Sequence, residues 1–156
     1  MRYFLGLNQD ITMDVLQGGF PYGTFRVKPD WDFTTDGEIL PGQPVTLVGN
    51  ETIALANGDA IGLSFSFVTQ KVNEALDDFS RPVAVQMGQF IARIYAPAYD
   101  TSASWAVATD GSLTPLIAKN GKLTPKTASD TNYPTVAYLL AKEANSILVY
   151  FTGVNK

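Results

Sequence analysis

The sequence predicts a mainly β protein, a small antiparallel β-barrel or sandwich with an extended N-terminal arm and at most one or two short helices. Thirteen glycines and nine prolines divide the chain into short segments rich in Val, Ile, Thr, Phe and Tyr, as strands are. Residues 61–67 alternate Ile, Leu and Phe with Gly and Ser, as a half-buried strand does. The 156 residues fit one domain, which at this size buries roughly 70% of its unfolded surface.

Residues 1–35 differ from the rest of the chain. The run 18–23, Gly-Gly-Phe-Pro-Tyr-Gly, is too rich in glycine and proline for a helix or a central strand. We therefore divide the chain into an N-terminal arm or edge segment, 1–35, and a β-barrel or sandwich domain, 36–156. The aromatic side chains of the first part either cover the barrel as an edge strand or reach a neighbouring molecule.

Turn signals predict the hairpins. Asn57-Gly58-Asp59 indicates a hairpin between residues 52–55 and 61–67, because Asn and Gly both tolerate positive φ. The near-copies DGSLTP and NGKLTP, which start at Asp110 and Asn120, each place a tight turn before a strand that proline ends.

Two segments leave helix and non-helix open. Residues 68–79 have apolar residues at spacings of four, four and three, which fits a short helix, with a polar loop as the alternative. Residues 135–141 and 147–152 predict a closing hairpin. Because Ala and Leu also favour helices, a helix over 135–144 is its alternative.

The composition excludes most catalytic chemistry. The chain has no cysteine, which removes disulfides, thiolate catalysis and cysteine metal sites. It has no histidine, the usual acid–base group near neutral pH and the commonest metal ligand. No Gly-x-Ser-x-Gly elbow or phosphate-binding loop is present. We expect no catalytic residue, no cofactor and no metal site.

Weak chemical signals have ordinary explanations. Asp30, Asp32 and Asp36 lack the glycine and glutamate offsets of a calcium loop and predict a solvated loop. Asp77 and Asp78 are neighbours, and neighbours on a helix point apart. Exposed aromatic residues bind sugars in some proteins, so Tyr22, Trp31 and Trp105 keep a carbohydrate-binding interpretation open.

Charge and hydropathy limit the partners. The net charge is −4 and the basic residues are scattered, so we expect no nucleic-acid partner. The apolar run at residues 3–7 is too short for a signal peptide or a membrane span, so we expect no membrane partner and synthesis in the cytoplasm. Apolar residues make up 46% and charged residues only 17%, which leaves apolar surface for an interface or for a well-filled core.

One family resemblance emerges from the order of turns and strands. The segments DGEILPGQPVTLVGN, IALANGDAIGLSFS, RPVAVQMGQFIARIYAP, DGSLTPLIAKNGKLTP and TVAYLLAKEANSILVYFTGV together resemble decoration, or cement, proteins of tailed-phage capsids. The resemblance covers roughly residues 36–154 as a pattern rather than as one diagnostic motif. The long N-terminal segment and the possible helix at 68–79 depart from it.

The resemblance implies a structural virion protein with no enzymatic activity. Such a protein would bind the major capsid protein on the outside of an assembled shell and stabilise it, commonly as a homotrimer. Aromatic residues dominate protein interfaces, so we expect the contact in the N-terminal segment. The residues that we predict for this interface are Phe20, Tyr22, Phe25, Trp31 and Phe33.

Other functions remain as alternatives. A tail, neck or fibre-base component of the virion shares this composition, and its place in the particle would separate it from a shell protein. A carbohydrate-binding β-module is a second alternative, and an enzyme that uses only carboxylates is a third.

Overall fold

The computed structural model describes residues 11–28, 30–69 and 83–153, and these contain nine strands and no helix. None of the described residues forms a helix with the length and hydropathy of a membrane span. The strands are β1 (Met13–Val27), β2 (Pro44–Gly49), β3 (Thr52–Leu55), β4 (Gly62–Ser64), β5 (Val83–Tyr95), β6 (Thr114–Lys119), β7 (Lys122–Pro125), β8 (Ala137–Lys142) and β9 (Ser146–Phe151).

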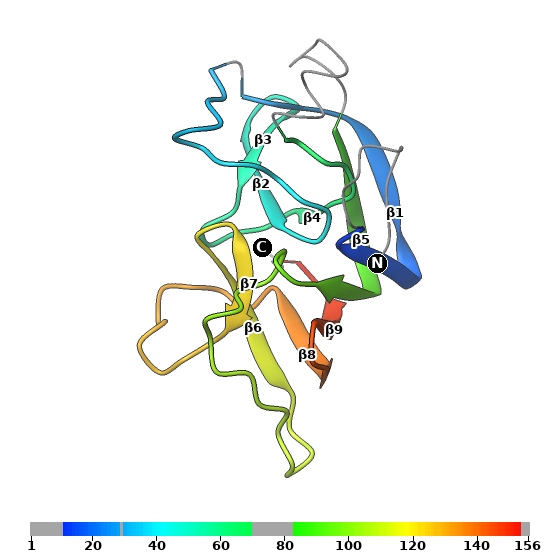
Figure 1. Cartoon of the computed structure of the whole chain (residues 1–156), viewed down its shortest axis with the longest axis vertical. Helices are drawn as coiled ribbons and strands as arrows, with labels where there is room; N and C mark the ends of the chain where they lie inside the picture. The colour runs from blue at the N-terminus through cyan, green and yellow to red at the C-terminus, as the bar shows by residue number, and fades with distance from the viewer. Residues whose placement is uncertain (1–10, 29, 70–82, 154–156) are drawn as a thin grey trace.

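All nine strands belong to one sheet, in the order β1-β3-β2-β4-β5-β9-β8-β6-β7, and β1 also pairs with β5. The pairings of β1, β3, β2, β4 and β5 therefore form a ring, and the other four strands continue from β5 as an open sheet (Figure 1). The predicted mainly β fold is confirmed. Of its two forms the sandwich-like one fits, because the whole sheet does not close into a barrel.

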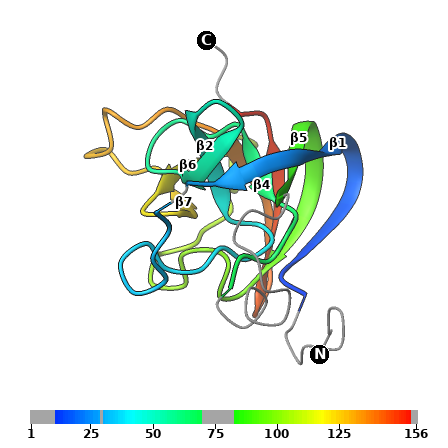
Figure 2. The ribbon, with the colours of Figure 1, turned by 90° about the horizontal axis from the view of Figure 1, so that it is seen from above.

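Strands β1 and β5 are the longest and curve together along one side of the molecule (Figure 2). Between Gly18 and Phe20 β1 advances two residues, while β5 advances three, from Phe90 to Met87. Gly88 lies in this bulge with a φ of 83°. Because the extra residue reverses the alternation of side chains along β5, both halves of the strand send side chains into the interior.

The interior consists of two hydrophobic clusters. The first half of β5 contributes Val83 and Val85 to the upper cluster, which also contains residues of β1, β2 and β3. The second half contributes Phe90, Ala92 and Ile94 to the lower cluster, which also contains residues of β6, β7, β8 and β9. Phe90 stacks on Phe151 of β9 with ring centroids 5.1 Å apart. A single bulged strand thus serves both clusters.

The segment 1–35 enters the fold through β1. β1 pairs antiparallel with β5 from Met13 to Phe25, and parallel with β3 at Arg26 and Val27. No other described strand pairs with the outer side of β1 between Met13 and Phe25. The run 18–23, which the sequence excludes from a central strand, therefore lies in an edge strand. The division of the chain at residues 35 and 36 stays a prediction.

The turn predictions have mixed outcomes. Asn120 and Gly121, with φ of 52° and 78°, form the predicted turn between β6 and β7. The hairpin predicted at Asn57-Gly58 is wrong, because β3 and β4 pair with opposite sides of β2 rather than with each other. The Gly58 N–H instead donates to the Ala118 carbonyl at 2.8 Å, which joins this connection to β6.

Predictions for the remaining segments also differ in outcome. β8 and β9 form the predicted closing hairpin, and β8 replaces the alternative helix over 135–144. The strand predicted over 61–67 is shorter, since β4 spans only Gly62–Ser64 and Phe65 is exposed. The segment 68–79, for which the sequence leaves a short helix or a polar loop open, lies outside the described residues except for its first two positions.

Replacing Gly19 by alanine tests the close contact of β1 with β5. A Cβ at this position would stand 2.5 Å from the Met87 carbonyl oxygen, and the φ of 65° disfavours a side chain. We expect Gly19→Ala to lower the free energy of unfolding by about 2 kcal/mol or more in urea denaturation. Gly23→Ala, on the same strand with nothing within 4 Å, is the control and should be nearly neutral. Equal effects would contradict this account.

Candidate interaction surface and polar pocket

The structure separates the five aromatic residues predicted for an interface. Phe20 and Tyr22 on β1 are 52% and 42% exposed. Phe25 and Trp31 are buried in the upper cluster, and Phe33 is partly buried against it. The interface role of these residues stays a prediction. Their positions indicate that Phe20 and Tyr22 are available for contact, while Phe25 and Trp31 hold β1 and the following turns in place.

Trp31 anchors the segment that follows β1. Its indole Nε1 donates to the Gly37 carbonyl at 3.1 Å. Lys28 and Asp36 form an ion pair of 2.9 Å across the same turns. The hydrogen bond from the Asp32 N–H, followed by that from Lys28, lowers the pKa of Asp36. The Asp36 carboxylate therefore stabilises these turns. Among the described residues, no group of three or more His, Cys, Asp or Glu side chains could hold a metal ion.

An open groove of about 510 Å³ lies between β2 and β5, and we refer to it as the β2–β5 groove. Its apolar lining includes Leu47, Ile61 and Met87. Gly88 is also part of the lining, and a Cβ there would stand 3.5 Å from the Phe20 ring. Phe20 therefore lies beside the groove and extends its apolar surface. The complete lining is Thr46, Leu47, Asp59, Ala60, Ile61, Met87, Gly88, Thr152 and Gly153.

The edge of β1 is unsuited to pairing with another strand. Its pairing with β5 shifts register at three places, between Val15 and Gln17, between Gly18 and Phe20, and between Tyr22 and Phe25. Pro21 lacks a backbone donor. Bulges and proline are means by which proteins protect exposed edges from strand addition. The exposed aromatic side chains, rather than the backbone, are thus the part of β1 that offers a contact.

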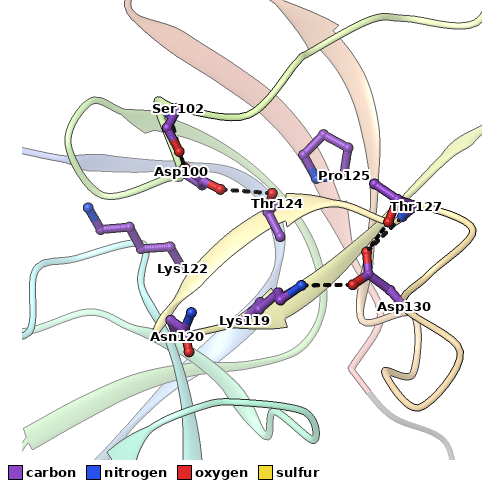
Figure 3. A pocket seen from close by; sticks show the side chains of 9 residues that line it. All are labelled: Asp100, Ser102, Lys119, Asn120, Lys122, Thr124, Pro125, Thr127 and Asp130. Atoms are coloured by element: carbon purple, nitrogen blue, oxygen red, sulfur yellow. Dashed lines mark hydrogen bonds and ion pairs between the residues drawn. The ribbon is translucent and has the colours of Figure 1, made fainter.

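A second concave site is polar and lies between the β6–β7 hairpin and two loops (Figure 3). Lys119 and Asp130 form an ion pair of 2.9 Å in it. The other oxygen of Asp130 accepts hydrogen bonds from the Thr127 N–H and hydroxyl, both at 2.8 Å. The hydrogen bond from Lys119, followed by those from Thr127, lowers the pKa of Asp130 to about 2.

Asp100 is the second carboxylate of the polar pocket. It accepts hydrogen bonds from the Ser102 hydroxyl at 2.6 Å, the Ser102 N–H at 3.0 Å and the Thr124 hydroxyl at 3.0 Å. Burial raises its pKa and these hydrogen bonds lower it, with a net downward change. Both carboxylates are therefore anionic at neutral pH and bonded to their own loops. A low pKa makes them poor general acids or bases near pH 7, so the pocket fits a structural role.

No motif in the sequence indicates the whole polar pocket, although one part of it has a local sequence signal. Asp100 and Asp110 each precede a serine by two residues, and each Oδ1 accepts the N–H of that serine. This is the Asx turn that an Asp-x-Ser sequence favours. The ion pair between Lys119 and Asp130 has no comparable signal in the sequence, because the two residues are separated in the chain and only the fold brings them together.

The carbohydrate-binding interpretation loses two of its three aromatic residues as surface platforms. Trp31 is buried. Trp105 is partly buried, donates its Nε1 to the Asp100 carbonyl at 2.7 Å and packs edge-on against Tyr99. Of these three residues, Tyr22 alone presents an exposed ring.

The Asp130 network predicts an acid-dependent loss of stability. Because folding lowers the pKa of Asp130, its ionised form stabilises the protein above its unfolded pKa of about 3.8, and this contribution disappears as the pH falls toward 2. We expect Asp130→Asn to be less stable than wild type at pH 7, with a difference that shrinks between pH 4 and pH 2. Urea denaturation at several pH values measures it.

The control is Glu38→Gln, which removes an exposed carboxylate with no hydrogen bond among the described residues. A difference between Asp130→Asn and wild type that stays constant down to pH 2 would contradict the role given to this network.

Comparison with known proteins identifies the family. The family model of phage cement proteins matches residues 12–149, which run from just before β1 into β9 and include the polar pocket and the groove lining except Thr152 and Gly153. No curated protein matches the chain. Cement proteins form a structural family, so the apolar groove and the non-catalytic character of the polar pocket agree with the match. The chain therefore belongs to the phage cement protein family and has a structural role associated with the phage capsid.

Proposed function

We propose that the protein binds the outside of the assembled capsid through the major capsid protein and stabilises the shell. The observation that supports this most is the β2–β5 groove, where Leu47 is exposed, together with exposed Phe20, which lies beside the groove and pairs with Met87. Apolar side chains in a concave surface exclude water efficiently when a partner covers them. Aromatic residues at the centre of such a surface contribute most of the binding energy in many complexes.

On an assembled shell, a binding surface of modest affinity is sufficient to stabilise the lattice. A protein that binds only the assembled lattice stabilises that lattice by mass action. Many copies bind one shell, so each single contact can be modest. The net charge of −4 and the scattered basic residues give no attraction for packaged DNA, which supports the outer surface as the binding side.

We also propose that the protein assembles as a homotrimer, as the family resemblance implies. A symmetric oligomer presents three grooves to the lattice at once, which raises the effective affinity. We expect sedimentation equilibrium of the purified protein to give about three times the 16.9 kDa chain mass. A monomer at all concentrations, both free and on the shell, would contradict this part of the proposal.

Substitutions in the β2–β5 groove test the capsid-binding surface. Leu47→Ser and Phe20→Ser should each weaken binding to empty shells by about tenfold, since each removes an apolar side chain from the contact. Co-sedimentation of the protein with shells that lack it measures the affinity. Val48→Ser is the matched control, because Val48 is similarly exposed on β2 but does not line the groove.

Three outcomes separate the alternatives. Weaker binding of the two groove variants but not of Val48→Ser supports the proposal. Wild-type affinity of both groove variants would move the binding surface elsewhere. If wild-type protein does not bind shells and occurs in about a dozen copies or fewer per virion, the neck or tail alternative replaces the proposal.

A further inference from the structure

The connection between β5 and β6 is a long loop with an exposed apolar end. Val107 and Leu113 in it are 45% and 55% exposed. Figure 1, whose vertical is the longest axis, shows this loop at the lower end of the molecule, with β2 in the upper half. We refer to residues 106–114 as the tip loop. It is separate from the β2–β5 groove, and none of its residues lines that groove.

The base of the loop is firmly attached to the sheet. The Trp105 indole N–H donates to the Asp100 carbonyl at 2.7 Å, and its ring packs on Tyr99 with centroids 5.4 Å apart. Asp100 also accepts a hydrogen bond from Thr124 of β7. Tyr99 is buried in the lower cluster. The loop is thus anchored to the body where it leaves β5.

The tip loop is also closed on itself. The Thr114 hydroxyl donates to the Ala106 carbonyl at 3.2 Å, which joins its two ends. Val107 and Leu113 are the next residues inside this closure, one on each limb. At the turn, the Asp110 carboxylate accepts the Ser112 N–H at 3.0 Å and the Ser112 hydroxyl. A preformed loop loses little conformational entropy on binding, so apolar side chains that it keeps in solvent are suited to a contact.

Charge defines what the tip loop can bind. No Lys or Arg occurs between Arg93 and Lys119, so the only formal charges of that stretch are Asp100 and Asp110. Asp110 is exposed, and both hydrogen bonds from Ser112 go to its Oδ1. The hydrogen bond from the Ser112 hydroxyl, followed by that from its N–H, lowers the pKa of Asp110, so the carboxylate is anionic at neutral pH.

We propose that the tip loop is a second contact surface, which binds an apolar patch beside a Lys or Arg on a neighbouring capsid subunit. This inference rests on the proposed function, because it requires the β2–β5 groove to bind the first subunit. With contacts at two separate surfaces, one protein molecule bridges two subunits. Bridging stabilises the lattice beyond what binding to a single subunit provides, because separation of the subunits then breaks a contact.

The test compares binding to unassembled major capsid protein with binding to empty shells, and measures the melting temperature of the shells. The double variant Val107→Ser with Leu113→Ser removes the apolar pair. We expect it to bind unassembled capsid protein like wild type, to bind shells about tenfold more weakly and to raise their melting temperature less. Leu16→Ser, an exposed leucine of β1, is the matched control and should behave as wild type.

A charge variant gives an independent test of the partner's chemistry. Asp110→Asn keeps the oxygen that accepts from Ser112 but removes the charge. We expect it to weaken shell binding severalfold at low ionic strength and to approach wild type at 1 M salt, where charges are screened. If this variant binds shells with wild-type affinity at low salt, the proposed contact of Asp110 with a Lys or Arg is wrong.

The outcomes distinguish this inference from the proposed function. If the double variant equals wild type in shell binding and in shell melting temperature while Phe20→Ser is impaired, the tip loop has no contact and the groove still does. If the double variant is equally impaired toward unassembled protein, the tip loop binds the same subunit as the groove, and bridging is wrong. If wild type does not bind shells, the proposed function fails and the inference fails with it.

Discussion

The close pairing of β1 with β5 is the constraint on which the rest of the structure depends. It brings Gly18 and Gly19 against the bulge at Gly88, where larger residues would meet backbone atoms. The bulge lets β5 serve both hydrophobic clusters. The same contact places Phe20 over Gly88, at the side of the β2–β5 groove. The pairing of β1 with β5 thus determines both the packing of the interior and the exposure of the Phe20 ring.

A protein that exposes apolar side chains on an edge strand needs protection from irregular edge-to-edge strand pairing with other chains. β1 has three register shifts and Pro21, so its backbone offers no regular ladder to another strand. In the tip loop, a hydrogen bond from the Thr114 hydroxyl to the Ala106 carbonyl joins the two ends of the loop. Both surfaces present exposed apolar side chains. Recognition through side chains is selective for shape and charge, which suits a protein that binds one particular lattice.

The sequence predicted the fold class because the residue types that favour strands and tight turns can be recognised in short stretches of the chain. Asn120-Gly121 formed its hairpin, whereas Asn57-Gly58 did not, since β2 lies between the strands that flank it. The exposure of the aromatic residues in the N-terminal segment was harder to predict. Bulges in β1 change the alternation of side chains, so the sequence could not separate exposed Phe20 from buried Phe25. The β2–β5 groove combines separate segments, and no local pattern indicates it.

The most direct test of the central claim is an electron cryo-microscopy reconstruction of the shell with the protein bound. The account predicts that the β2–β5 groove and Phe20 lie against the outer surface of the major capsid protein, with the fold of β1 and β5 unchanged. A reconstruction in which this groove faces solvent while another face of the sheet contacts the shell would contradict it.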